Sequence, residues 1–112
     1  MSKLEEKITA YIAEAKKLNL DLSDELISNV TKGLGPSIYN ADAETIASSD
    51  KEELARLKTN FLVKKLGLTD DEKLDEAIEE LIEALGKSNR NKYRALAYAW
   101  LAKKFKKESV YK

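Results

Sequence analysis

Residues 92–105 read KYRALAYAWLAKKF, and they contain ALAYAWLA at 95–102, the longest apolar run in the chain. Large apolar side chains recur there at helical spacing, while alanines cover much of the opposite side. A helix that is apolar nearly all round is one against which other helices pack, and small alanines let neighbouring backbones come close. The stretch therefore predicts the central helix of a bundle. Its apolar stripe is expected to consist of Tyr93, Leu96, Ala97, Trp100, Leu101 and Phe105, with Trp100 in the core.

Signals for further helices precede this stretch. A Ser or Thr followed three residues later by Glu is a capping box, which satisfies free backbone N–H groups at a helix start. Glycines that follow helically spaced apolar runs predict helix ends. The predicted helices begin at Ser2, Ser23, Ser49, Thr69 and Ser88 or Asn89, and they end near Leu18, Gly33, Gly67, Gly86 and Phe105. A short helix, capped by Asn40 or Asp42, is expected through 43–47.

No segment alternates polar and apolar residues with the period of a strand. A length of 112 residues is typical of one domain. The sequence therefore predicts an all-α fold: one helical domain over residues 1–112, built as a compact bundle of about five helices plus one short helix, with the C-terminal helix central.

The composition lacks the residues that several enzyme classes need. The chain has no cysteine and no histidine, so it has no thiolate nucleophile and lacks the most common general base and metal ligand. The acidic residues between 70 and 83 lack the ligand pattern of a calcium-binding hand and the Glu-x-x-His pairs of a di-iron bundle. We therefore expect no catalytic activity, no metal and no cofactor.

The first residues do not have the pattern of a signal peptide, and the apolar run at 95–102 is too short to span a bilayer. A hydrophobic fraction of 43% with 36% charged residues is typical of a soluble globular domain. These features predict a cytoplasmic protein without a membrane partner.

The zero net charge conceals an asymmetry. Residues 1–85 hold 11 Lys/Arg against 19 Asp/Glu, and residues 86–112 hold 9 Lys/Arg against one Glu. A short link between the acidic helix at 70–85 and the basic one after it favours antiparallel packing, which would set opposite charges side by side. The alternative is a basic C-terminal face left free for a polyanion. Nucleic acid is the less favoured partner because the chain as a whole is neutral.

The stretch GLGPSIYNADA at 33–43 holds two of the four glycines and the only proline. It lacks the Lys-Ser/Thr of a phosphate-binding P-loop, and no strand precedes it as a dinucleotide fingerprint requires. Gly33 suits a left-handed helix stop, and Pro36 forces Gly35 out of the helical region. We expect a connector that crosses the bundle with Ile38 and Tyr39 turned inward, and a ligand-binding loop is the alternative.

The stretch SNRNKYR at 88–94 combines a predicted helix start with basic side chains. Backbone N–H groups at a helix start attract anions, whereas the bland interpretation is a capped helix with solvated basic residues. A joint anion site would require the 33–40 loop to lie beside the start of the last helix. The candidate ligand-binding residues are Ser37, Tyr39, Asn40, Ser88, Asn89, Arg90 and Arg94.

Three stretches, GPSIYNADAETIA at 35–47, NFLVKKLGL at 60–68 and SNRNKYRALAYAWLAKKF at 88–105, resemble the bacterial domain-of-unknown-function family 2853. The resemblance covers nearly the whole chain. It implies a compact all-helical fold and a bacterial origin, and it implies no activity or site residue.

Together these features predict a non-enzymatic binding or protein-interaction module with an unknown protein partner. The alternative is a protein that binds a small anion or a nucleotide through the 33–40 loop and the start of the last helix.

Overall fold

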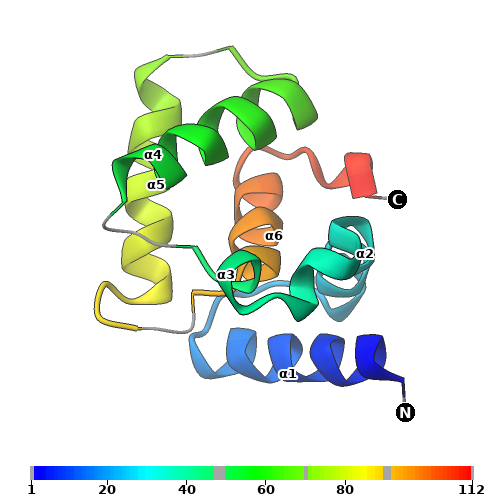
Figure 1. Cartoon of the computed structure of the whole chain (residues 1–112). Helices are drawn as coiled ribbons and strands as arrows, with labels where there is room; N and C mark the ends of the chain where they lie inside the picture. The colour runs from blue at the N-terminus through cyan, green and yellow to red at the C-terminus, as the bar shows by residue number, and fades with distance from the viewer. Residues whose placement is uncertain (1, 47–49, 70, 90–91, 112) are drawn as a thin grey trace.

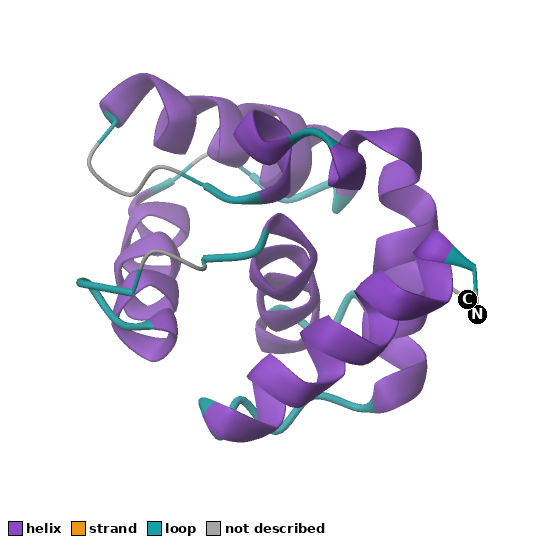
Figure 2. Ribbon diagram, turned by 60° about the horizontal axis from the view of Figure 1, so that its bottom comes forward, coloured by secondary structure: helices purple, strands orange, loops and turns teal. Residues whose placement is uncertain are grey.

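The structure, a computed structural model, describes residues 2–46, 50–69, 71–89 and 92–111. Their fold is all-α, as predicted, and the one β contact among them is an isolated bridge between Thr45 and Tyr93. Figures 1 and 2 show helices joined by loops in both views. The α-helices are α1 (Lys3–Lys17), α2 (Asp24–Leu34), α3 (Ala41–Glu44), α4 (Lys51–Arg56), α5 (Glu72–Leu85) and α6 (Arg94–Lys104). The 3₁₀ segments are η1 (Gly35–Tyr39) and η3 (Glu108–Tyr111), and η2 (Leu57–Lys65) continues α4 as a π-helix.

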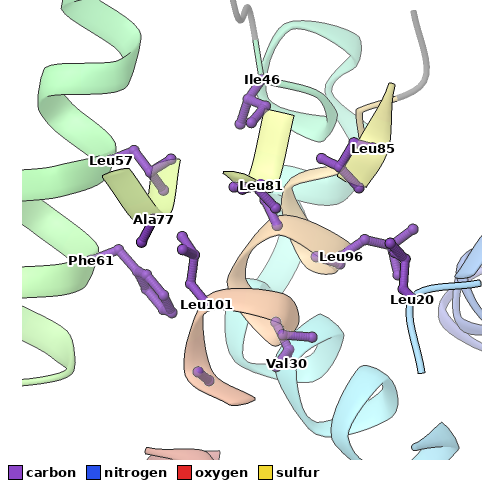
Figure 3. Close-up of a cluster of buried hydrophobic side chains, with 14 of the residues drawn as sticks. Leu20, Val30, Ile46, Leu57, Phe61, Ala77, Leu81, Leu85, Leu96 and Leu101 are labelled. Atoms are coloured by element: carbon purple, nitrogen blue, oxygen red, sulfur yellow. The ribbon is translucent and has the colours of Figure 1, made fainter. Parts of the chain in front are cut away.

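Helix α6 is central, as its composition predicts (Figure 1). It packs against α2 and α5 and touches α1 and α3. Side chains from α2, α5, α6 and η2 converge in the core, including Val30, Leu81, Leu101 and Phe61 (Figure 3). The alanine-rich side is fully buried, with exposures of at most 1% for Ala95, Leu96, Ala97, Ala99, Leu101 and Ala102.

Trp100 is less buried than the expected core position requires. Its side chain is half-buried, with the Lys104 ammonium 5.6 Å from the ring centroid. Leu96, Ala97 and Leu101 of the predicted stripe are fully buried, and so are the alanines at 95, 99 and 102. Trp100 is left at the margin of this buried surface.

Of the five predicted helix starts, two are confirmed, two are displaced by one or two residues, and the last is displaced further. Ser2 accepts a hydrogen bond from the Glu5 N–H, and Ser23 accepts one from the Leu26 N–H. Helix α4 is capped by Asp50 and α5 by Asp71, instead of Ser49 and Thr69. Ser49 lies outside the described residues. Aspartate is as good a cap as serine and brings a charge that the helix dipole favours, so the neighbouring residue prevails.

The predicted stops at Gly67 and Gly86 are confirmed by φ angles of 71° and 94°. The predicted end of the second helix near Gly33 is correct to within one residue, since α2 ends at Leu34, but Gly35 rather than Gly33 takes the positive φ, 66°. Pro36 explains the shift, since it keeps the residue before it out of the helical region. Ile38 is buried as expected, whereas Tyr39 is 47% exposed.

The last helix begins at Arg94, not at Ser88 or Asn89. Asn89 instead caps the preceding helix, because its Nδ2 donates to the Leu85 carbonyl at 2.9 Å. Residues 92–93 lie beside residues 45–46, where the Ile46 N–H donates to the Lys92 carbonyl at 2.9 Å. Because Asn89 caps α5 and Lys92 pairs with Ile46, α6 does not begin until Arg94.

Candidate functional site

A polar cluster joins α3 to α1. The Glu44 carboxylate accepts hydrogen bonds from Lys7 Nζ and Tyr11 Oη, both at 2.6 Å. The Tyr11 ring is buried and lies 4.7 Å from the ring of Tyr93 at the start of α6. Burial and the neighbouring Glu44 carboxylate raise the pKa of Tyr11 far above its ordinary value. The hydroxyl therefore stays protonated and acts as a donor that joins α1 to α3, while the ring contacts Tyr93.

Arg94 fixes the other side of α3. Its Nε donates to the Ala43 carbonyl at 2.8 Å, and its guanidinium reaches the Tyr98 hydroxyl at 3.3 Å and Glu53 at 2.5 Å. Burial of the Glu53 carboxyl opposes its ionisation, but hydrogen bonds from Arg94 and Arg56 outweigh this and lower the pKa of Glu53. The cation of Arg94 is thus already neutralised within the fold.

The remaining candidate residues serve local structure or face solvent. The Ser37 hydroxyl donates to the Leu34 carbonyl at 2.9 Å, and Asn89 also reaches Glu14 at 3.4 Å. The Asn40 carbonyl accepts the Ala43 and Glu44 N–H groups at the start of α3. Ser88 and Tyr39 are exposed. Arg90 lies outside the described residues.

The segment that lies beside the start of the last helix follows the predicted 33–40 loop and is not part of it. Residues 43–46 run beside residues 92–94, joined by the Thr45–Tyr93 bridge and the Arg94–Ala43 hydrogen bond. Ser37 is bonded to α2, and the Arg94 side chain bonds to Ala43, Tyr98 and Glu53. The neighbourhood is a brace between elements.

A different surface presents apolar side chains to solvent. We call it the α4–α5 groove, a depression of about 280 Å³ lined by Lys51, Leu54, Ala55, Lys58, Asp75, Ile78, Glu79 and Ile82. Ala55 is exposed, while Leu54 and Ile82 are half-buried. The salt bridge from Lys58 Nζ to Asp75 Oδ1, at 3.2 Å, spans the two walls. The sequence patterns considered above did not single out these residues, because apolar positions at helical spacing are usually read as core.

A comparison with known protein families matches residues 10–109 to the family described as "Protein of unknown function (DUF2853)". The chain belongs to this family. The match includes all three stretches on which the resemblance was based. A comparison with curated proteins gives no match.

One contact of this DUF2853 chain was missed by sequence reasoning altogether. Lys92 is 5% exposed, and its ammonium donates to the Lys87 and Asn89 carbonyls at 2.9 and 2.5 Å. It closes the loop between α5 and α6. Its position in a basic stretch suggested a solvated side chain, and no local pattern distinguishes a lysine that folds back on its own loop.

Within the described part of the DUF2853 chain, every buried side-chain nitrogen and oxygen has a hydrogen-bond partner. The same residues contain no group of three or more acidic side chains placed to hold a metal ion. No described helix is both long and apolar enough to cross a membrane.

Proposed function

We propose that this chain is a non-enzymatic protein-interaction module, and that the α4–α5 groove is its docking surface. The observation that carries the proposal is the pairing of two helical stripes in one groove. One wall presents residues 51, 54, 55 and 58, and the other presents residues 75, 78, 79 and 82. Both follow the i, i+3, i+4, i+7 spacing of a helix face that packs against another helix.

The internal polar clusters support a scaffold rather than a catalyst. Tyr11 is held as a hydrogen-bond donor with a raised pKa, which is the opposite of what a tyrosine base requires. Glu53 is paired with two arginines, and its lowered pKa makes it a poor proton acceptor. Both clusters join helices, so their chemistry supports the fold.

The anion-binding alternative has less support. Among the predicted site residues, Ser37, Asn89 and Arg94 already make internal hydrogen bonds. An anion would have to break these bonds before it gained new ones. A thermal-shift screen against phosphorylated metabolites and nucleotides tests this alternative. A ligand present at 100 times its Kd would stabilise the fold by about 2.7 kcal/mol, and we expect no such shift.

Cross-linking from the groove tests the docking surface directly. A photoreactive benzophenone side chain is placed at position 55, in the groove, or at position 13, an exposed alanine of α1, in cells that naturally contain the protein. We expect a defined protein adduct from position 55 that is absent from position 13, with the cross-linked peptides identified by mass spectrometry. Equal adducts from both positions, or none from position 55, would overturn the proposal.

A further inference from the structure

The shape of the α4–α5 groove fits a helix. Its two walls are the facing stripes of consecutive helical segments, and a third helix laid between them would complete a three-helix arrangement by ordinary ridge-into-groove packing. Positions 75 and 82 are seven residues apart, about 10 Å along the helix axis. The groove therefore accommodates about two turns of a partner helix.

The apolar floor of the groove defines one face of that partner. Leu54 and Ile82 are half-buried, and Ile78 is 5% exposed between them. Apolar side chains from a partner helix would complete their burial. A loop or an extended peptide would leave its own backbone groups unpaired over this floor, which is costly away from water.

Charge defines the other face of the partner. An acidic stripe of Glu72, Glu76, Glu79 and Glu83 runs along α5, and all four side chains are exposed. Within the described residues none of the four forms an ion pair, unlike Glu80, which pairs with Lys104 at 2.5 Å. Glu79 belongs to both the acidic stripe and the groove lining. The stripe thus borders the α5 side of the apolar floor with unpaired negative charge, while Lys51 and Lys58 lie on the opposite wall.

We propose that the α4–α5 groove binds a basic amphipathic helix of a partner protein, with apolar residues against the floor and Lys or Arg toward the acidic stripe. This inference rests on the proposed function. The basic end of a second copy does not offer such a helix, because Leu96, Leu101 and the alanines of α6 are buried in its own core and Tyr98 and Trp100 are half-buried there. The partner is therefore a different protein.

A labelled peptide tests the inference by fluorescence anisotropy. The probe is a helical peptide of about 18 residues built from Leu and Lys, with leucines at i, i+3, i+4, i+7 spacing. One control has the same composition in scrambled order, and another has Glu in place of Lys. We expect the amphipathic Lys peptide to bind at least about tenfold more tightly than either control, because only it matches both floor and charge.

A matched pair of variants locates the binding surface. Ala55→Arg puts a bulky cation into the groove, and Ala13→Arg puts the same side chain on an exposed face of α1. We expect Ala55→Arg to weaken binding of the Lys peptide at least about tenfold, and Ala13→Arg to weaken it less than about twofold. Circular dichroism checks that both variants keep the wild-type helix content.

Several outcomes would overturn the inference. Equal binding of the scrambled peptide would show general electrostatic attraction, and equal effects of the two variants would place the site elsewhere. Self-association that Ala55→Arg abolishes, measured by sedimentation, would make a second copy the occupant. If position 55 still cross-links a protein in cells while the Lys peptide does not bind, the docking surface stands and only the basic-helix inference fails.

Discussion

Single charged residues at the brace around α3 link the stability of the fold to pH. Glu53 has its pKa lowered below its ordinary value of 4.5, because the hydrogen bonds from Arg94 and Arg56 outweigh the effect of burial. A carboxyl whose folded pKa is depressed stabilises the fold above its unfolded pKa, and that contribution is lost as pH falls through the folded pKa. The brace should therefore weaken in acid.

Glu53→Gln tests this linkage. At pH 7 the variant should lose about 1–3 kcal/mol of unfolding free energy, because half-buried Arg94 keeps its charge without a carboxylate partner. The difference between wild type and variant should shrink as pH falls below 4.5 and through the lowered pKa of Glu53, since wild-type Glu53 then becomes neutral too. Urea unfolding across this range measures the effect. A pH-independent difference would show that Arg94 and Arg56 do not lower the pKa of Glu53 in the fold.

The Tyr11–Glu44 hydrogen bond predicts an asymmetric pair of variants. Tyr11→Phe removes the donor and keeps the ring, so it should cost about 0.5–1.5 kcal/mol. Glu44→Ala should cost more, about 1–3 kcal/mol, because the buried Tyr11 hydroxyl loses its acceptor. Chemical unfolding of both variants provides the measurement. A larger loss for Tyr11→Phe than for Glu44→Ala would contradict the geometry.

At the residue scale, the burial of side chains could be predicted where apolar residues are regularly spaced. The prediction of burial failed where the chain reverses direction. Ile38 is buried as predicted, but Tyr39 is exposed because the 3₁₀ geometry of η1 points the two side chains apart. Arg94 was selected as an anion ligand from its position near a helix start. Its actual partner, Glu53, is 41 residues away, and a contact of that range leaves no mark in local sequence.

At the scale of elements, most helices follow from apolar periodicity, whereas their boundaries depend on competing caps. Asp50 and Asp71 each lie one or two residues after the predicted cap. The start of α6 lies several residues later than predicted, because Asn89 caps α5 and residues 92–93 pair with 45–46. Local sequence rules identify the candidate caps, but tertiary contacts determine which of them is used.

The boundary between α2 and η1 predicts opposite tolerance at two glycines. Gly35 has φ 66° and ψ −150°, a region essentially restricted to glycine. Gly35→Ala should therefore cost about 1–3 kcal/mol. Gly33 is helical, and an added Cβ would lie 3.3 Å from the Tyr111 ring, a contact that the gain in helix propensity partly offsets. Thermal unfolding should show Gly35→Ala as the more damaging change, and the reverse order would contradict this boundary.

Because the glutamates of the acidic stripe repel one another, a substitution that removes this repulsion should stabilise α5. Glu76 has glutamates four residues away on each side, Glu72 and Glu80, and like charges at this spacing destabilise a helix. Glu76→Lys should raise stability by about 0.5–1 kcal/mol. Glu80→Lys is the matched control and should give no gain, since it breaks the pair with Lys104. Equal gains from both changes would show that the Lys104 pair contributes nothing.

On the scale of the whole molecule, the charge asymmetry was visible in the sequence, but the ion pairs that the charged residues form were not. Helices α5 and α6 are antiparallel neighbours, as predicted (Figure 1). Yet one ion pair, Lys104–Glu80, joins them among the described residues. Other basic residues bind different partners: Lys103 forms an ion pair with Asp21, and the Lys92 ammonium donates a hydrogen bond to the Lys87 carbonyl of its own loop. Among the described residues the acidic stripe therefore forms no ion pair, and its role in binding a partner, the bacterial origin and the cytoplasmic location stay predictions.

The most direct test of the docking surface is a map of amide chemical shifts during titration with the amphipathic Lys peptide. We predict that the largest changes fall on residues 51–58 and 75–83, the walls of the α4–α5 groove and its acidic border. The 35–40 and 88–94 segments should remain unchanged, because their described side chains brace the fold. Changes confined to those two segments would contradict the α4–α5 groove as the site of interaction. The same conclusion would follow if no shifts changed at a peptide concentration of about 1 mM, because a specific complex has a Kd well below that concentration.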